Sequence, residues 1–219
     1  TVAIFFDLEF LVPPEDRSDV GASLNVNPFR ENHVVLGGAF ARGFPLKSGG
    51  LDALEYQEFW LWKERDERAV LAGMLDFFRE SWKLLAGKKS NQADLITVGV
   101  GIGRVDLPVL LARCVELEIA PRAELFDCFC KTKVVDLGAV AIPFFPNGTP
   151  ILHPKTNNEI TKRFGVSSDK PSGKKVWRMY EDQDHAGIEQ RTRSEVETCV
   201  RLYQAAVDQV FHSRDDPKR

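Results

Sequence analysis

Hydrophobic residues along the chain form runs whose spacing separates strands from helices. Residues 1–11, 34–44 and 94–101 are almost continuously apolar, which is typical of strands buried on both faces of a sheet. Glycines inside 34–44 predict a bulge or close packing there. Residues 134–137 fit either a short strand or the start of a helix.

Other apolar residues recur every three or four positions, which is the period of an amphipathic helix. Residues 67–86 carry such a stripe, made of Val70, Met74, Phe77, Phe78 and Trp82. Residues 107–117 also read as a helix, with Pro108 in the first turn, where proline is tolerated. We expect a long helix at 188–210 and a short helical turn at 160–164.

The alternation of strands and helices predicts an α/β fold. Loops are expected at 12–30, 45–54, 143–154 and 169–175. The run Phe59-Trp60-Leu61-Trp62 is expected to pack into the core or against an insertion. The length of 219 residues suits one medium domain. We assign it to residues 1–211 and expect 212–219 to form a charged tail.

Composition limits the cellular locations and the classes of binding partner that we expect. The formal net charge of −3 gives no global basic field, so a polyanion must be held by a local patch or through a metal. The sequence has no membrane-spanning apolar run and no basic-then-apolar leader, so we expect a cytoplasmic protein without a membrane partner. The cysteines are expected to be buried, reduced thiols; they are Cys114, Cys128, Cys130 and Cys199.

Two carboxylates interrupt the first apolar strand, in the sequence Phe5-Phe6-Asp7-Leu8-Glu9-Phe10. Side chains alternate across a strand, so Asp7 and Glu9 leave the same face. Two like charges in apolar surroundings are costly unless they are neutralised. A divalent cation does this well, because magnesium and manganese prefer hard oxygen ligands. The simpler alternatives are a solvated strand end and a helix-cap partner.

A glycine-rich turn, GVGIGRVD, follows the strand at 94–101 and leads through Asp106 into the next helix. On spacing alone, the simplest role for Asp106 is to cap that helix. The glycines do not form the G-x-G-x-x-G pattern of dinucleotide folds, so a nucleotide cofactor is not expected.

A third acidic position, Glu195, lies within the long C-terminal helix. The largely apolar face of that helix contains Ile188, Thr192, Glu195, Cys199, Leu202 and Ala206. A carboxylate on a core-facing stripe needs a partner. The partner is either a metal shared with other acids or a basic side chain such as Arg191.

Together these stretches resemble the DEDD superfamily of 3′–5′ exonucleases, which have an RNase H-like fold. FFDLEF resembles the first motif, TVGVGIGRVDLPVL is similar to the second, and SEVETCVRLY is similar to the last helix. The nearest members are predicted exonucleases akin to the proofreading domain of B-type DNA polymerases. The resemblance covers residues 2–203 and implies an RNase H-like mixed sheet flanked by helices.

The resemblance also implies a site and an activity. It makes Asp7, Glu9, Asp106 and Glu195 the catalytic, metal-binding acids, holding two Mg²⁺ or Mn²⁺ ions. Asp7, Glu9 and Glu195 would hold the ion on the side of the attacking water, and Asp7 with Asp106 would hold the other. The implied reaction is two-metal hydrolysis at the 3′ ends of single-stranded DNA or RNA.

The last motif departs from the family pattern. The fourth acid is Glu195 instead of Asp, and Arg191 and Gln190 stand where the family has Tyr or His. The alternative is therefore a catalytically impaired module that binds nucleic acid or a protein; an RNase H-like endonuclease acting on hybrids is a further one. A competing alignment takes Tyr180 and Asp184 as the last motif.

Substrate binding is expected in the basic segment 155–178. Basic groups would hold phosphates and an aromatic ring would stack on bases. The predicted residues are Lys162, Arg163, Lys174, Lys175 and Trp177. The alternative is a solvated loop beside the site.

Overall fold

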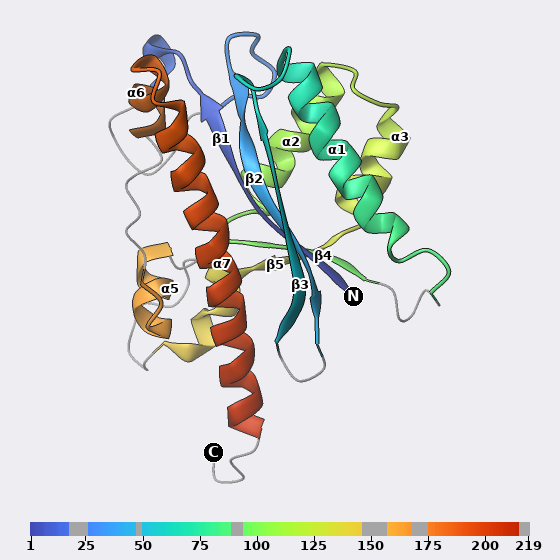
Figure 1. Ribbon diagram of the computed structural model, residues 1–219, viewed down its shortest axis with the longest axis vertical. Helices are drawn as coiled ribbons and strands as arrows, with labels where there is room; N and C mark the ends of the chain where they lie inside the picture. Colours follow the sequence, from blue (N-terminus) through green and yellow to red (C-terminus); the bar gives the residue numbers. More distant parts are fainter. Residues whose placement is uncertain (18–25, 47–49, 89–93, 146–156, 168–174, 215–219) are drawn as a thin grey trace.

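A mixed five-stranded sheet lies at the centre of the computed structural model, which describes residues 1–17, 26–46, 50–88, 94–145, 157–167 and 175–214 (Figure 1). The strand order is β3-β2-β1-β4-β5. The strands are β1 (Val2–Leu11), β2 (Val34–Pro45), β3 (Leu51–Trp60), β4 (Leu95–Gly99) and β5 (Lys133–Asp136). β1, β2 and β3 are antiparallel, whereas β4 and β5 run parallel to β1. The predicted α/β class with a mixed sheet is confirmed.

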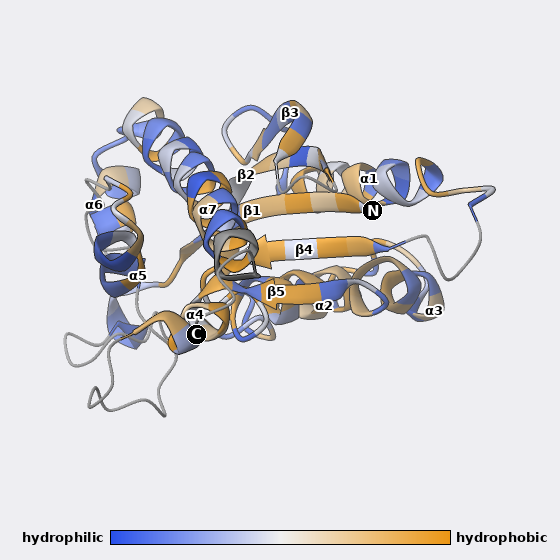
Figure 2. Cartoon of the chain, turned by 90° about the horizontal axis from the view of Figure 1, so that it is seen from below, coloured by the Kyte–Doolittle hydropathy of each residue, from blue (hydrophilic) through white to orange (hydrophobic). Residues whose placement is uncertain are grey.

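Helices cover both faces of the sheet (Figure 1). On one face lie α1 (Glu67–Lys83), α2 (Asp106–Glu116), α3 (Arg122–Leu125) and the π-helical turn η2 (Phe126–Cys130). On the other lie α4 (Leu137–Val140), α5 (Asn157–Phe164), α6 (Lys175–Glu181) and α7 (His185–Arg214). Two 3₁₀ turns, η1 (Pro14–Asp16) and η3 (Ile142–Phe144), complete the described elements. Figure 2 shows β1 and β4 as mostly hydrophobic, as expected for strands covered on both sides.

The alternation of β1 decides what each face of the sheet contacts. Its even-numbered residues, from Ile4 to Phe10, pack into the core beneath α1 and α2. Its odd-numbered residues Ala3 and Phe5 pack into the core beneath α7. Because the period of a strand is two, Asp7 and Glu9 continue the face that α7 covers.

Glycines of β2 allow close approach beside these acids. Gly37 pairs with Glu9, and the register shifts between Glu9 and Phe10, which confirms the predicted bulge. A Cβ on Gly37 would lie 2.1 Å from the Phe59 carbonyl oxygen, and its φ of +146° is rarely adopted by other residues. Glycine at this position is therefore required to bring β3 against β2.

Strand β3 was not predicted, and residues 45–54 were wrongly assigned entirely to a loop. Residues Asp52–Gln57 of this edge strand are all exposed. Polar residues on both faces protect an open sheet edge, but they remove the apolar alternation that identifies a strand. Phe59 and Trp60 are buried, and Leu61 and Trp62 are partly buried against the core, so the expected core packing is complete only for the first two.

Element ends also differ from the sequence predictions. Residues 134–137, expected to form either a short strand or the start of a helix, contain both. Strand β5 ends at Asp136, and α4 begins at Leu137. The predicted tail from residue 212 begins inside α7, and residues 215–219 lie outside the described part. All four cysteines are free thiols, of which Cys130 is exposed, contrary to expectation. No helix of the described residues is long and apolar enough to cross a bilayer.

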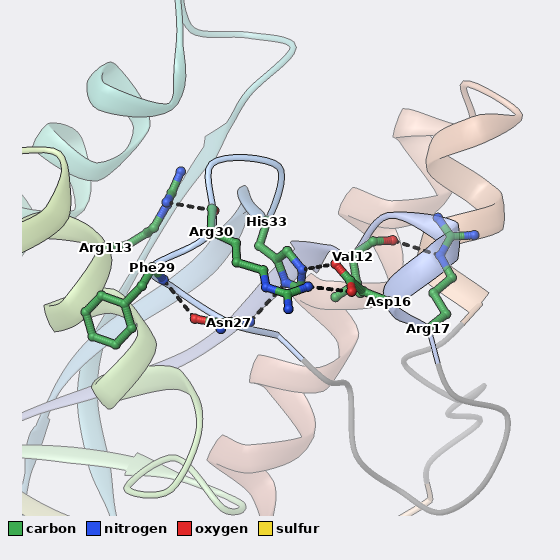
Figure 3. A network of polar contacts seen from close by, with 8 residues as sticks. All are labelled: Val12, Asp16, Arg17, Asn27, Phe29, Arg30, His33 and Arg113. Atoms are coloured by element: carbon green, nitrogen blue, oxygen red, sulfur yellow. Dashed lines mark hydrogen bonds and ion pairs between the residues drawn. The ribbon is translucent and has the colours of Figure 1, made fainter.

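A polar network around the buried His33 joins residues 26–33 to η1 (Figure 3). His33 is 2% exposed, and its Nδ1 accepts the Asn27 N–H at 2.9 Å. Its Nε2 therefore carries the ring proton and donates to Asp16 at 2.9 Å. Hydrogen bonds from Arg30 and His33 lower the pKa of Asp16. These contacts hold η1 at the end of β1.

Arg113 of α2 ties this segment to two helices. Its guanidinium forms two hydrogen bonds with the Glu67 carboxylate, at 2.8 and 2.7 Å. It also donates to the carbonyls of Pro28, at 3.0 Å, and Arg30, at 3.2 Å. Glu67 in turn accepts the Val35 N–H at 2.8 Å. The Arg113–Glu67 pair therefore provides hydrogen-bond partners for backbone groups of residues 28–30 and of β2.

Replacing Arg113 with Met should destabilise the fold by about 3 kcal/mol, because Glu67 would remain largely buried without its charged partner. Chemical denaturation at neutral pH measures the change. The matched control is Arg122→Met at the exposed start of α3, which should cost under about 0.5 kcal/mol. Equal losses in the two variants would contradict the role given to the Arg113–Glu67 pair.

Candidate metal centre

Carboxylates from two elements converge on the face of the sheet beneath α7. Asp7 and Glu9 come from β1 and Glu195 from α7, and one oxygen of each lies within 4.8 Å of the others. Glu9 and Glu195 are each 5% exposed, whereas Asp7 is half-buried. The cluster is therefore closed on the side of α7 and reaches solvent through Asp7.

A fourth carboxylate, Asp106, approaches from α2. The turn before it requires Gly101, whose φ is +74° and whose N–H donates to Asp136 at 3.0 Å. Pairing between β1 and β4 ends at Phe5, so the Leu8 N–H lies beyond the end of β4. The Asp106 carboxylate accepts this N–H at 3.3 Å. This contact places Asp106 beside the backbone between Asp7 and Glu9.

Asp106 does not cap α2, which was the simplest interpretation of its spacing. Val105 is the N-cap residue, and its side chain makes no capping hydrogen bond. Burial and the negative charge of Asp7 raise the pKa of Asp106 well above its ordinary value. Asp7 is thus close enough to disfavour the ionisation of Asp106, an effect that a bound cation reverses.

Arg191 of α7 lies between two of these acids. Its Nη1 contacts Glu9 Oε1, and its Nη2 lies 2.5 Å from Glu195 Oε1. The salt bridge proposed as an alternative partner for Glu195 is therefore present. The Thr192 hydroxyl also donates to Glu9 Oε1, at 2.9 Å.

Arg191 keeps its charge in this position. Its burial, at 9% exposure, lowers the pKa of the guanidinium. The charges of Glu9, Glu195 and Asp7 outweigh that effect and raise the net pKa above the ordinary value. One guanidinium against three or more carboxylates still leaves the cluster negative. Hard oxygen donors and excess negative charge suit Mg²⁺ or Mn²⁺, so the donor set fits a divalent cation.

The competing alignment of the last motif is not supported. Asp184 is exposed, and its Oδ1 accepts the Gly187 N–H at 3.0 Å in the first turn of α7. Asp184 therefore lies at the start of the helix, whereas Glu195 lies in the acid cluster.

The predicted nucleic-acid-binding residues occupy different environments. Lys162 and Lys175 are exposed, and Lys174 lies outside the described residues. Arg163 donates to the Phe144 carbonyl. Trp177 is 5% exposed, and its indole N–H donates to the Phe10 carbonyl at 3.1 Å. This burial argues against base stacking by Trp177.

A pocket of about 500 Å³ lies at the end of β1 and was not predicted. It includes Leu11, two residues beyond Glu9, together with Arg17, Tyr180 and His185. The His185 ring stacks on Trp62 with centroids 4.3 Å apart. Because the lining comes from β1, the segment after it, α6 and α7, no local sequence pattern marks this pocket.

Known structures support the fold. The chain is similar to the family B DNA polymerase from the hyperthermophilic archaeon Pyrobaculum calidifontis, with a TM-score of 0.58 and 19% sequence identity. The similarity covers 96% of this chain and 24% of the polymerase, so the chain spans about a quarter of that protein's length. At this identity it supports the RNase H-like fold alone. No family model and no curated protein matches the sequence.

Proposed function

We propose that this chain is a metal-dependent phosphodiester hydrolase that removes nucleotides from the 3′ ends of single-stranded nucleic acid. The observation that carries the proposal is the convergence of Asp7, Glu9 and Glu195 within 4.8 Å, with Asp106 beside them. The resemblance of the three sequence motifs to DEDD exonucleases, and the polymerase-like fold, point to the same chemistry.

The acids would divide between two cation positions. Asp7, Glu9 and Glu195 would hold one divalent ion, and Asp7 with Asp106 would hold the other. Ions so placed supply a hydroxide-like nucleophile at neutral pH and stabilise the charge on the leaving oxygen.

Other residues of the chain orient these acids and leave a path to them. The Thr192 hydroxyl and the Leu8 N–H fix one oxygen each of Glu9 and Asp106. The substrate phosphate would approach from the half-buried Asp7, and the terminal nucleotide would occupy the neighbouring pocket that contains Arg17 and His185. Lys162 and Lys175 remain proposed contacts for the rest of the strand.

The wild-type protein with Mn²⁺ should shorten a 5′-labelled single-stranded oligonucleotide stepwise from its 3′ end. Chelation of the metal should stop the reaction, because the acids then have no cation with which to activate water. Gel analysis of a linear strand, with and without chelator, measures the shortening and its dependence on metal. A circular single strand, which has no 3′ end, reports internal cuts. Absence of products with every divalent ion would contradict the proposal, and internal cuts in the circle would favour an endonuclease.

A second candidate function is a module that binds single-stranded nucleic acid without cutting it. The observation that favours it is Arg191, which already provides a positive charge between Glu9 and Glu195. Fluorescence anisotropy with a labelled strand in chelator separates the two functions. Binding with no cleavage after Mn²⁺ addition would support the module, whereas metal-dependent cleavage would exclude it.

A further inference from the structure

We propose that Arg191 is a built-in occupant of the cation position between Glu9 and Glu195, and that a divalent ion and this guanidinium exclude each other there. The inference rests on the metal site of the proposed function. It adds a regulatory property to that site: the chain itself sets the concentration of divalent ion that the site requires.

Glu9 presents one carboxylate oxygen to two donors of α7. Its Oε1 faces both Arg191 Nη1 and the Thr192 hydroxyl. The Thr192 hydroxyl has one proton, which the Ile188 carbonyl, 2.9 Å away, also accepts, so this donor can turn away from Glu9. Arg191 has no such neutral alternative in this contact, and its positive charge opposes a metal ion that approaches the same oxygen.

Glu195 extends the conflict to a second ligand. Arg191 lies one helical turn before Glu195 on α7, and its Nη2 is 2.5 Å from Glu195 Oε1. The planar fork of the guanidinium thus reaches the two carboxylates with separate nitrogens. The charged side chains of this trio are each only 6% exposed, so solvent screens them weakly. An added divalent ion would meet strong repulsion unless the guanidinium withdrew.

The consequence is competition within one molecule. When a binding-competent state is only a fraction of the population, the apparent dissociation constant rises by the inverse of that fraction. A salt bridge formed in 90 to 99% of molecules would weaken metal binding by roughly 10- to 100-fold. Low divalent concentrations therefore leave the site closed by Arg191, and high concentrations open it.

The direct test is Mn²⁺ binding without any nucleic acid, followed by electron paramagnetic resonance of the free ion. Arg191→Met removes the charge and should lower the Mn²⁺ concentration at half-saturation by roughly 10- to 100-fold. The matched control is Arg193→Met, on the same helix, whose guanidinium lies 2.6 Å from Glu58 on the exposed side. The control should bind like wild type. Equal Mn²⁺ affinity in all three proteins would overturn the inference.

A second variant covers the case in which Arg191→Met does not fold without metal. Arg191→Lys keeps a positive charge, but a single ammonium cannot match the two-pronged contact. We expect it to fold and to bind Mn²⁺ several-fold more tightly than wild type. Binding no tighter than wild type would likewise overturn the inference.

The outcomes separate this inference from the hydrolase proposal. Tighter Mn²⁺ binding by the Arg191 variants, with no cleavage of any strand, would support the competition and refute the hydrolase. Cleavage by the wild-type protein, together with equal Mn²⁺ affinity of wild type and the Arg191 variants, would support the hydrolase and refute the competition.

Discussion

Replacing Asp7 with Asn should reduce metal-dependent cleavage by on the order of 10³-fold, because removing one preorganised electrostatic contact at a reacting centre has effects of this size. Asp7 is the proposed ligand shared by both cation positions, and it is the half-buried acid through which the cluster meets solvent. Asn keeps the shape of Asp but loses its charge. Initial rates with a 3′-end substrate at saturating Mn²⁺ measure the loss.

The fold should survive this change. Asp7 lies near Asp106, Glu9 and Glu195, so removing its charge relieves repulsion in the metal-free protein. The unfolding temperature of Asp7→Asn in chelator should therefore equal or exceed that of wild type. An inactive variant that is also unfolded would be no support for a catalytic role.

Asp184→Asn is the matched control, because it makes the same chemical change at the acid of the competing alignment. Asn accepts a hydrogen bond at a helix N-terminus as well as Asp does, so the contact with Gly187 should persist. Full activity is expected. Loss of activity in Asp184→Asn, or normal cleavage by Asp7→Asn, would contradict the assignment of the site.

Replacing Arg191 with Met should destabilise the metal-free protein by about 3–5 kcal/mol, which is the usual result of removing one partner from a buried ion pair. Glu9 and Glu195 would remain buried beside one another without the guanidinium. Denaturant unfolding in chelator measures the loss. Added Mn²⁺ should restore much of the stability, because an ion that binds only the folded state stabilises it.

A charge-matched variant provides the control for this prediction. Combining Arg191→Met with Glu9→Gln and Glu195→Gln removes all three charges, so no buried charge is left without a partner. The triple variant should regain stability in chelator and lose the response to Mn²⁺. A single Arg191→Met variant as stable as wild type in chelator would contradict the electrostatic role of Arg191.

The periodicity of the sequence predicted part of this site. The alternation of β1 placed Asp7 and Glu9 on one face, and the apolar stripe of α7 placed Glu195 toward the core; the structure brings these three acids together. Asp106 was different, because its spacing alone favoured a helix cap. Its actual partner, the Leu8 N–H, becomes available only because β4 stops short of the end of β1.

Other features depend on contacts that no local pattern encodes. The sequence raised Arg191 as a possible partner of Glu195, but its contact with Glu9 depends on where α7 crosses β1. Trp177 stands among basic residues and suggested base stacking, yet its indole N–H donates to the Phe10 carbonyl. Edge strand β3 lacks an apolar face along most of its length, so its pairing with β2 was not predictable from hydrophobic period.

Anomalous diffraction from crystals of the wild-type protein grown at saturating Mn²⁺ locates any bound ion among the acids. We expect a manganese peak bound by Asp7, Glu9 and Glu195, with the Arg191 guanidinium withdrawn from both glutamates. No peak beside Asp7, with Arg191 still in contact with Glu9 and Glu195, would contradict this expectation.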